Sequence, residues 1–525
     1  MRALRTIIYL LSAASWGIAH HAAAQSIDWQ QFDATAFNKA RQENKPVILD
    51  LGASWCHWCH VMDEKTYGNT TVINYLADHY ITIRSNQDKR PDLYARYKDY
   101  GWPATIIFNS NGEELTKEAG YMEPDTFLTL LKRYNGNSKP AIRADHSPVT
   151  AQKGVWSPQI AQYIRNDFFE YLDKELGGYD MEQKFLDYDG IAFALTQRNT
   201  DPTLKKWLDR SIKASYQLND PVWGGVCQYS SNYDWQHPHY EKILGIQARY
   251  IKIYSRYYLA TGDTSARRHA QRIIAYLDTF FKSKNALYYN SQDADLIAGI
   301  HAGEYFALND QQRRAQGIPR IDSACYTREN AQVAEAMVYY WAATGEQQYL
   351  DRAQQILQTI VQQYRQADSS YSHDLFPAGA PALADQLYLC QALLQHYNAS
   401  GNTANLQIAK DIMQYILRHF KRPAGGYNSF AGNDPLLKAI PVLSENIDLC
   451  RLLNKLSYYG EPSFKIAAGN ILAYIISPTV LKGIIAEPGI LMAQTELRLP
   501  PKQNKMAIRT AWAQPADYFV VTWDK

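Results

Sequence analysis

Apolar and polar positions follow two different patterns along the 525-residue chain. Up to about residue 134, short apolar runs alternate with segments of helical spacing. "PVILDLGAS", residues 46–54, is almost wholly apolar, as expected for a strand buried on both faces. Further strands are predicted at 80–86 and 101–115, and helices at 32–46, 72–80 and 123–134. Alternating strands and helices predict an α/β domain with a mostly parallel or mixed sheet covered by helices.

After residue 154 the pattern changes to long amphipathic helices. Four units recur, each a helix, a short turn and a second helix, with the turns at Gly262, Gly345, Gly401 and Gly460. The turns lie 83, 56 and 59 residues apart, which is too irregular for a consensus solenoid. Repeated hairpins with long loops on one side predict an all-α, closed toroid of paired helices, and an open superhelix is the alternative.

Two further segments complete the domain organisation. Residues 135–154 are polar and rich in Asn, Ser, Pro and Gly, which indicates a linker between a domain at 25–134 and one at 155–525. Residues 1–24 have a basic start, a short apolar run and small residues before Gln25, as in a secretory signal peptide. We therefore expect cleavage after about Ala24 and a periplasmic or secreted product without a membrane span.

Composition narrows the function classes. A formal net charge of +2 gives no electrostatic case for binding nucleic acid or an anionic membrane surface. Six cysteines in so long a chain do not make a disulfide scaffold. Cys390 and Cys450 occupy equivalent places in successive hairpins, and we expect them to be buried small apolar residues rather than a disulfide.

The stretch Cys56-His57-Trp58-Cys59-His60 fits three chemistries: a redox pair, a haem-attachment site or a set of zinc ligands. It follows a predicted buried strand and precedes a helix, so Cys56 would lie at a helix N-terminus, where a thiolate is stabilised. Zinc would require two further ligands, and His79 is the other nearby candidate. The context favours redox chemistry over haem, zinc or a purely structural disulfide. We expect no metal and no cofactor beyond a redox-active Cys56–Cys59 disulfide.

"VILDLGASWCHWC", followed by "GWPATIIFNSNGEEL", closely resembles the thioredoxin fold. In this resemblance Trp55 precedes the active-site cysteine, Pro103 matches the cis-proline that holds an incoming chain, and Asp50 matches the buried acid. The resemblance implies that Cys56 is an exposed nucleophile and Cys59 a buried resolving thiol.

Three neighbouring side chains carry further expectations. His57, if protonated, would favour the Cys56 thiolate. Asp50 would accept the proton of Cys59 if buried, and a surface carboxylate at the strand end is its alternative. His60 is expected on the helix surface.

The whole mature chain resembles a family in which a thioredoxin domain is fused to a six-hairpin, glycosidase-like helical toroid. The family includes the spermatogenesis-associated thioredoxin-like proteins of animals. The motifs that carry the resemblance are "CHWCHVM", "RPDLYARY", "GGYDMEQKF", "WGGVCQYSSNYDWQHPHYEK", "NSQDAD", "LADQLYLC" and "LSENIDLC". It implies a thiol-disulfide oxidoreductase that acts on protein thiols or disulfides, with a toroid that binds a client or a carbohydrate. A carbohydrate-active, epimerase- or glycosidase-like enzyme with an accessory thioredoxin domain is the alternative.

Loops of the helical half offer a second set of candidate residues, which we expect to converge on one mouth of the toroid. They are Trp235, His239, Glu241, Asp293 and Asp295. His237, His239 and Glu241 alternate as metal ligands could, but the resemblance does not support His237.

Asp293 and Asp295 are either an acid/base pair for sugar chemistry or structural residues that cap helices and bind loop amides. Where the family carries two consecutive glutamates after this motif, the chain has His301-Ala302-Gly303 with Glu304 one place beyond. This departure counts against catalysis by the toroid.

Overall fold

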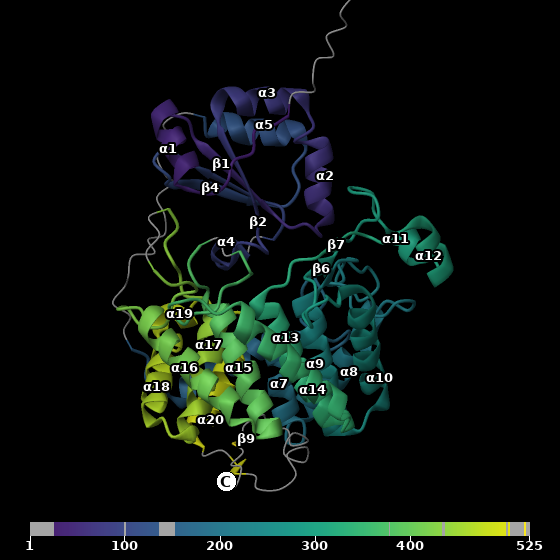
Figure 1. The fold of residues 1–525 in the computed structure, drawn as a ribbon, viewed down its shortest axis with the longest axis vertical. Coiled ribbons are helices and arrows are strands. Elements are labelled where there is room, and N and C mark those ends of the chain that lie inside the picture. Colours follow the sequence, from purple (N-terminus) through teal and green to yellow (C-terminus); the bar gives the residue numbers. More distant parts are fainter. Residues whose placement is uncertain are drawn as a thin grey trace, which may run out of the picture.

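The protein is described by a computed structural model that covers residues 26–98, 101–135, 153–376, 379–432 and 436–499, together with the backbone of 502–503 and 519–520. The predicted signal peptide at 1–24 and nearly all of the predicted linker at 135–154 lie outside these residues. Figure 1 shows an α/β domain seated over one end of a helical domain.

The N-terminal domain is built on a four-stranded mixed sheet with the order β2-β1-β3-β4. Its strands are β1 (Val47–Gly52), β2 (Ile81–Asn86), β3 (Ala104–Phe108) and β4 (Glu114–Ala119). β1 runs parallel to β2 and antiparallel to β3, and β3 pairs with β4 in antiparallel fashion. The predicted mixed sheet is confirmed.

Helices cover both faces of this sheet: α1 (Ala34–Glu43), α2 (His57–Lys65), α3 (Thr70–His79), α4 (Pro91–Tyr97) and α5 (Pro124–Arg133). Successive residues of a strand point to opposite faces. Leu49 and Leu51 of β1 therefore pack in one cluster with residues of α1 and α4, whereas Ile48 packs in another with residues of α2, α3 and α5. Asp50 alternates with Leu49 and Leu51, so it lies on the α2 face.

The helical domain is a closed double ring. The inner helices are α7 (Tyr188–Gln197), α9 (Leu244–Thr261), α13 (Thr327–Thr344), α15 (Leu383–Ser400), α17 (Leu443–Leu456) and α20 (Gly489–Arg498). Each inner helix packs on the next, and α20 packs on α7, which closes the ring. The outer helices are α6 (Pro158–Glu170), α8 (Pro202–Ser215), α10 (Thr264–Tyr276), α14 (Gln347–Gln363), α16 (Thr403–His419) and α18 (Pro462–Ile475). The predicted (α/α)6 toroid is confirmed, and the open superhelix is excluded.

The four predicted hairpins correspond to α9–α10, α13–α14, α15–α16 and α17–α18. Their turns contain Gly262, Gly345, Gly401 and Gly460, which all have left-handed φ angles between 74° and 93°. Glycine adopts this conformation without a Cβ clash, so it ends each first helix sharply. The sequence analysis missed the pair α7–α8 and the closing pair formed by α6 and α20.

Short elements complete the described chain. They are the helices α11 (Gly303–Phe306), α12 (Asp310–Gln316) and α19 (Pro478–Leu481), the strand pair β8 (Lys502–Gln503) and β9 (Phe519–Val520), and the small sheet of β5 (Lys242–Ile243), β6 (Ser291–Gln292) and β7 (Ile321–Asp322). In Figure 1, β6 and β7 lie at the end of the toroid that faces the α/β domain.

Cys390 and Cys450 are free and fully buried, as predicted. Within the described ranges, no helix is long and apolar enough to cross a membrane.

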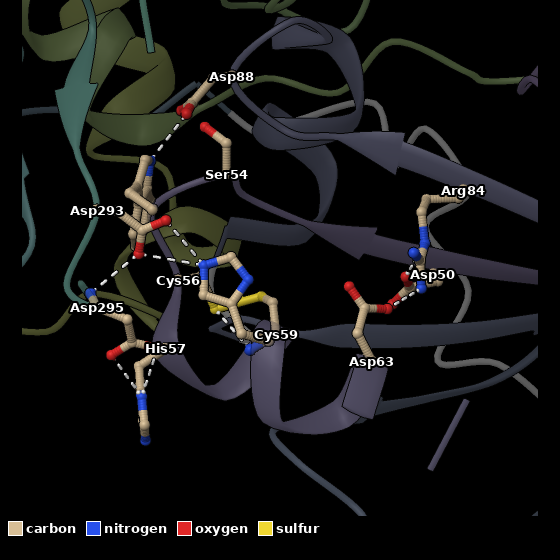
Figure 2. The surroundings of a disulfide bond; sticks show 12 residues. Asp50, Ser54, Cys56, His57, Cys59, Asp63, Arg84, Asp88, Asp293 and Asp295 are labelled. Carbon is tan, nitrogen blue, oxygen red and sulfur yellow. Dashed lines mark hydrogen bonds and ion pairs between the residues drawn. A yellow bond between two sulfur atoms is a disulfide. The ribbon is translucent and has the colours of Figure 1, made fainter. Parts of the chain in front are cut away.

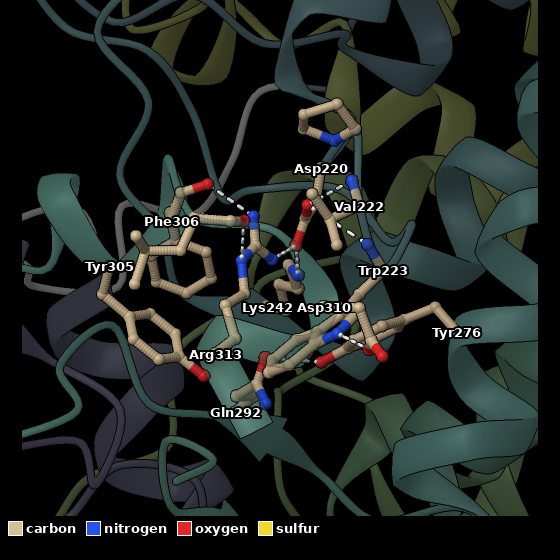
Figure 3. A network of polar contacts seen from close by, with 12 residues as sticks. Asp220, Val222, Trp223, Lys242, Tyr276, Gln292, Tyr305, Phe306, Asp310 and Arg313 are labelled. Atoms are coloured by element: carbon tan, nitrogen blue, oxygen red, sulfur yellow. Dashed lines mark hydrogen bonds and ion pairs between the residues drawn. The ribbon is translucent and has the colours of Figure 1, made fainter. Parts of the chain in front are cut away.

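A buried ionic network fixes the position of β5 (Figure 3). One carboxylate oxygen of Asp220 lies 2.7 Å from Nζ of Lys242 and 2.7 Å from Nη1 of Arg313. Both cationic side chains have no exposed surface, and the Arg313 guanidinium lies over the rings of Trp223 and Phe306. Burial alone would raise the pKa of Asp220, but the two cations outweigh it and lower the pKa to about 2.

We expect Asp220→Ala to destabilise the toroid by about 3 kcal/mol, because it leaves two buried cations without their counter-ion. Urea unfolding followed by circular dichroism measures this loss. The matched control is Lys205→Ala, which removes an exposed pair with Asp209 at 2.7 Å and should cost less than about 1 kcal/mol. Because the folded pKa of Asp220 lies below 3.8, its contribution should be present above pH 3.8 and disappear as the pH falls through about 2. Equal losses in the two variants would contradict this assignment.

Candidate active site between the two domains

Cys56 and Cys59 form a disulfide at the start of α2 (Figure 2). Cys56 is the N-cap residue of this helix, and its Sγ accepts a hydrogen bond from the backbone N–H of Cys59 at 3.2 Å. The predicted position of Cys56 at a helix N-terminus is confirmed. This position would stabilise a thiolate on Cys56, because unpaired backbone N–H groups point toward the sulfur.

The predicted exposure of the two cysteines is wrong. Cys56 is only 4% exposed, whereas Cys59 is partly buried. The reason is the toroid, since Ile243 of β5 packs against the cluster formed by Ala53, Trp55 and Cys56. The backbone N–H of Ala294 also donates to the carbonyl oxygen of Trp55 at 3.2 Å. Cys56 therefore lies at the interface between the two domains.

Two histidines of α2 bind two carboxylates of the toroid. Nδ1 of His57 lies 2.8 Å from Oδ1 of Asp295, and Nε2 of His60 lies 3.0 Å from Oδ2 of Asp293. Burial would lower the pKa of His60, but the hydrogen bond and charge of Asp293 outweigh it and raise the pKa. The predicted surface position of His60 is wrong, and His57 directs its ring toward Asp295.

Asp293 and Asp295 also accept hydrogen bonds from loop amides. Oδ1 of Asp293 accepts from the N–H of Asp295 at 3.1 Å, and Oδ2 of Asp295 accepts from the N–H of Gly299 at 2.9 Å. These contacts match the structural alternative for the two carboxylates. The sequence did not indicate their second role as partners of His57 and His60.

The same groups provide a possible metal-binding geometry. His60, Asp293 and Asp295 each place one ligand atom within 4.8 Å of the others. However, the guanidinium of Arg320 lies 3.6 Å from Oδ2 of Asp293, and a cation there disfavours a second cation. We therefore interpret the cluster as interdomain ion pairs.

Asp50 is buried beneath Cys59. It is 6% exposed and lies on the same face of β1 as Gly52, because residues two apart in a strand share a face. A Cβ atom on Gly52 would lie 3.2 Å from Sγ of Cys59, so this face of the strand supports the resolving cysteine. Burial raises the pKa of Asp50, although Nε of Arg84 lies 2.7 Å away and opposes the shift. The surface alternative for Asp50 is excluded.

Trp55 and Trp102 lie beside Cys56. The Trp102–Pro103 peptide bond is cis, as predicted, and Trp102 packs against the cluster that contains Cys56. The indole N–H of Trp55 donates to Oδ2 of Asp88 at 2.8 Å. Burial raises the pKa of Asp88 to about 7, so this carboxyl is partly protonated near neutral pH.

A cavity of about 370 Å³ lies between the domains and includes Cys56 in its wall. Trp102 and Tyr94 line it from the α/β domain, and His239, Glu241 and Arg249 line it from the toroid. Burial, together with the charges of His57 and His301, lowers the pKa of His239 to about 4. Burial raises the pKa of Glu241 to about 7.

The expected convergence of loop residues on one mouth holds for His239, Glu241, Asp293 and Asp295, which all lie beside α2 or its cavity. Trp235 is the exception, because it is not among the residues that line the cavity. It is 3% exposed, and its indole N–H donates to the carbonyl oxygen of Leu176 at 3.0 Å. Trp235 therefore packs within the loops.

The sequence analysis missed Asp88, Asn290 and His373. Nδ2 of Asn290 donates to Oδ2 of Asp88 at 3.0 Å, and Nε2 of His373 lies 2.7 Å from the backbone oxygen of Asp88. Both partners come from the toroid, so sequence spacing could not connect them. Asp88 itself follows β2, and Cys56 follows the parallel neighbour β1. Groups at the carboxyl ends of adjacent parallel strands lie close together. The positions of Asp88 and Cys56 after two such strands could therefore have indicated that the two residues are neighbours.

The fold and the site define a class of protein: a thioredoxin-like domain whose Cys-x-x-Cys helix docks on an (α/α)6 toroid. Comparisons with known proteins agree with this class. Residues 9–133 match the family described as Thioredox_DsbH, a protein of unknown function (DUF255). The chain is homologous to human spermatogenesis-associated protein 20, with 26% identity over 307 residues, 51% of this chain and 39% of the human protein. The matched part thus spans about two fifths of that relative. The N-terminal domain is thioredoxin-like and is similar to the DsbH model over the matched residues.

Two other comparisons concern the separate domains. The thiol:disulfide interchange protein DsbD of Campylobacter jejuni (strain RM1221) is 28% identical over 103 residues, 18% of each chain. A sugar epimerase from a ruminal bacterium is 15% identical, with a TM-score of 0.48 over 60% of this chain and 85% of that chain.

The ion pair between His60 and Asp293 should hold the domains together over Cys56. We expect Asp293→Asn to speed the reaction of reduced Cys56 with a polyethylene-glycol maleimide about tenfold, because a charged hydrogen bond contributes about 1.5 kcal/mol. Asp411→Asn, on the exposed face of α16, is the control and should leave the rate unchanged. The raised pKa of His60 means that the contact is strongest below pH 6.5 and weakens as the pH rises through the folded-state value. Equal rates in wild type and Asp293→Asn would contradict a role in closure.

Proposed function

We propose that the protein is an exported thiol-disulfide oxidoreductase that uses Cys56 and Cys59, with a toroid that forms the second wall of the active site. The observation that carries this proposal is the position of the cysteine pair at the N-terminus of α2, in the wall of the interdomain cavity. The buried carboxyl of Asp50 and the cis-proline Pro103 support it. The DsbD relative is a thiol:disulfide interchange protein, which points in the same direction.

The chemistry follows from the two positions. In the reduced protein, the thiolate of Cys56 attacks a client disulfide, a bond forms between Cys56 and one client sulfur, and the other client sulfur leaves as a thiolate. Asp50 then accepts the proton of Cys59, and the Cys59 thiolate attacks Sγ of Cys56. The Cys56–Cys59 disulfide forms, and the client leaves with two reduced sulfurs. The same steps in reverse oxidise a client dithiol.

The cavity constrains which client groups reach Cys56. With a volume of about 370 Å³ it is the size of a small-molecule site, so it admits a small thiol or disulfide or an extended segment of a protein client. Aromatic rings of Trp55, Trp58 and Tyr94 line it and would pack against such a segment or against a carbohydrate. The proposed partners are thus protein thiols and disulfides, with a carbohydrate as a second occupant of the toroid.

Carbohydrate chemistry in the toroid is the second candidate function. It is favoured by carboxyls on the inner helix α17, since burial raises the pKa values of Glu445 and Asp448 to about 7. Groups of this kind act as general acids in sugar chemistry. Loss of activity on Cys56→Ser supports the first function, and loss on Glu445→Gln or Asp448→Asn with an intact thiol exchange rate supports the second.

Export is the remaining part of the proposal. It rests on the signal-peptide pattern of residues 1–24.

The roles of the two cysteines predict which variant traps clients. We expect Cys59→Ser to accumulate mixed disulfides through Cys56, because nothing resolves them, and Cys56→Ser to form none. Non-reducing electrophoresis of periplasmic extracts, followed by mass spectrometry of the adducts, measures both. Trapping by Cys56→Ser but not by Cys59→Ser would reverse the roles.

Asp50→Asn should slow resolution of the mixed disulfide about a hundredfold without preventing its formation, because it removes only the acceptor of the Cys59 proton. Quenched-flow trapping with a small disulfide separates the two steps. The control is Asp125→Asn, which changes a solvent-exposed carboxylate of α5 in the same domain and should leave both steps unchanged. An unchanged resolution rate in Asp50→Asn would refute the role of this carboxyl.

A further inference from the structure

The wall of the cavity beside Cys56 contains a carboxyl group that the thioredoxin chemistry described above does not use. Glu241 is 4% exposed, and it lines the same cavity as Cys56. Its Oε2 has no hydrogen-bond partner among the residues that the structure describes. A buried polar atom without a partner costs about 1–3 kcal/mol, so such an atom in a cavity wall calls for a functional explanation.

Glu241 faces the start of α2. It directly precedes β5, and Ile243, two residues later, packs against the cluster that contains Cys56. Residues two apart in an extended segment share a face, so the side chain of Glu241 lies on the Cys56 side. The backbone N–H of His57 favours the charged form of the Glu241 carboxylate and so opposes the rise of its pKa. This N–H belongs to the first residue of α2, next to the cysteine.

Lys242 fixes this orientation. Its side chain points to the opposite face of β5 and lies 2.7 Å from Asp220 in the buried ionic network (Figure 3). A rotation of the strand that moved Glu241 away from α2 would break this network. The toroid therefore holds the carboxyl rigidly against the redox helix.

The charges around Glu241 leave it coupled to Cys56. His57 on α2 and Asp295 after β6 lie near it, and they are paired with each other at 2.8 Å. Cys227 and Tyr229, in the loop before β5, also face it. Burial raises the pKa of Cys227 to about 12 and the pKa of Tyr229 well above its ordinary value, so both stay neutral.

Two acids then share one helix N-terminus. The backbone N–H groups and dipole of α2 stabilise one negative charge there, either on the carboxylate of Glu241 or on the thiolate of Cys56. A second negative charge in the same enclosed site is disfavoured by repulsion. Burial places the pKa of Glu241 at about 7, close to the range in which a cysteine at a helix N-terminus titrates.

Resting on the proposed oxidoreductase function, we propose that Glu241 of the toroid takes the proton of Cys56 and returns it to the leaving thiol of the client. In the first step the proton moves from the Cys56 thiol to the Glu241 carboxylate. The Cys56 thiolate then attacks one sulfur of the client disulfide, and the other client sulfur leaves as a thiolate. That thiolate takes the proton from Glu241, so the carboxylate is restored and a neutral thiol leaves the cavity.

The proposal explains what the toroid adds to a thioredoxin-like domain. A thiolate released into an enclosed cavity is poorly solvated, and protonation by an adjacent carboxyl removes this cost. In an open thioredoxin site, water would perform this role. Here the toroid both excludes water and supplies the acid.

The test is the pH dependence of Cys56 alkylation in the reduced protein with Cys59 replaced by serine. Iodoacetamide reacts with the thiolate, so its rate follows the thiol pKa without any client. Glu241→Gln removes the competing anion, and we expect it to lower the Cys56 pKa by about one unit or more. Glu182→Gln, an exposed carboxylate of the same loop region, is the control and should leave the profile unchanged. A Cys56 pKa that is unchanged or raised in Glu241→Gln overturns the proposal.

Glu241→Asp distinguishes the loss of the carboxylate from a folding defect. It keeps the carboxylate but shortens the side chain by one methylene group, which moves the charge away from α2. The Cys56 pKa should therefore lie between those of wild type and Glu241→Gln. A second readout is the exchange rate with bis(2-hydroxyethyl) disulfide at pH 7, which we expect to fall at least tenfold in Glu241→Gln although more thiolate is present. A rate that rises in proportion to the thiolate fraction overturns the proton-donor step.

These outcomes separate the two proposals. If Glu241→Gln shifts the Cys56 pKa but no variant exchanges disulfides, the oxidoreductase function fails while the coupling of the two acids stands. If wild type exchanges disulfides and Glu241→Gln behaves like wild type in both measurements, only the role of Glu241 fails.

Discussion

The contact between the N-terminus of α2 and the loops around β5 and β6 is the constraint on which the site depends. The helix contributes Cys56, His57 and His60. The toroid contributes Asp295 and Asp293, which pair with His57 and His60, respectively. Because both histidines take part in these contacts, α2 cannot rotate relative to the toroid without breaking two ion pairs. The disulfide, the cavity and the buried carboxyl of Glu241 all take their geometry from this docking.

Burial of Cys56 changes the chemistry that its motif alone suggests. In an exposed Cys-x-x-Cys site, solvent stabilises the thiolate, solvates the leaving group and exchanges protons. In this protein Cys56 is 4% exposed, so each of these roles passes to a protein group. The N–H groups of α2 stabilise the anion, and acids with pKa values raised to about 7, Asp88 and Glu241, lie in the cavity wall. The low polarity that raises these pKa values also makes their proton exchange effective.

The sequence predicts the local elements well because they depend on local physics. The order of buried strand, cysteine motif and helix follows from apolar patterning, and the four hairpins follow from helical spacing and a glycine at each turn. The pair α7–α8 escaped prediction because its turn, residues 198–201, contains no glycine. The pair of α6 and α20 escaped because its helices come from opposite ends of the domain, so no turn joins them.

The site could be predicted only in part, because local sequence patterns do not encode contacts between distant segments. Asp50, Cys56 and Pro103 lie within one domain and carry a thioredoxin-like pattern, whereas the partners of His57 and His60 lie 238 and 233 residues away. The exposure expected for Cys56 was wrong because exposure is a property of the docked domains, which no local pattern encodes. In the proposed mechanism, docking also gives the two proton transfers to two different domains. Asp50 lies beneath Cys59 on the thioredoxin side, and Glu241 faces Cys56 from the toroid. A thioredoxin-like domain alone retains the first carboxyl and loses the second, so the fusion of the two domains is what gives each cysteine an acid of its own.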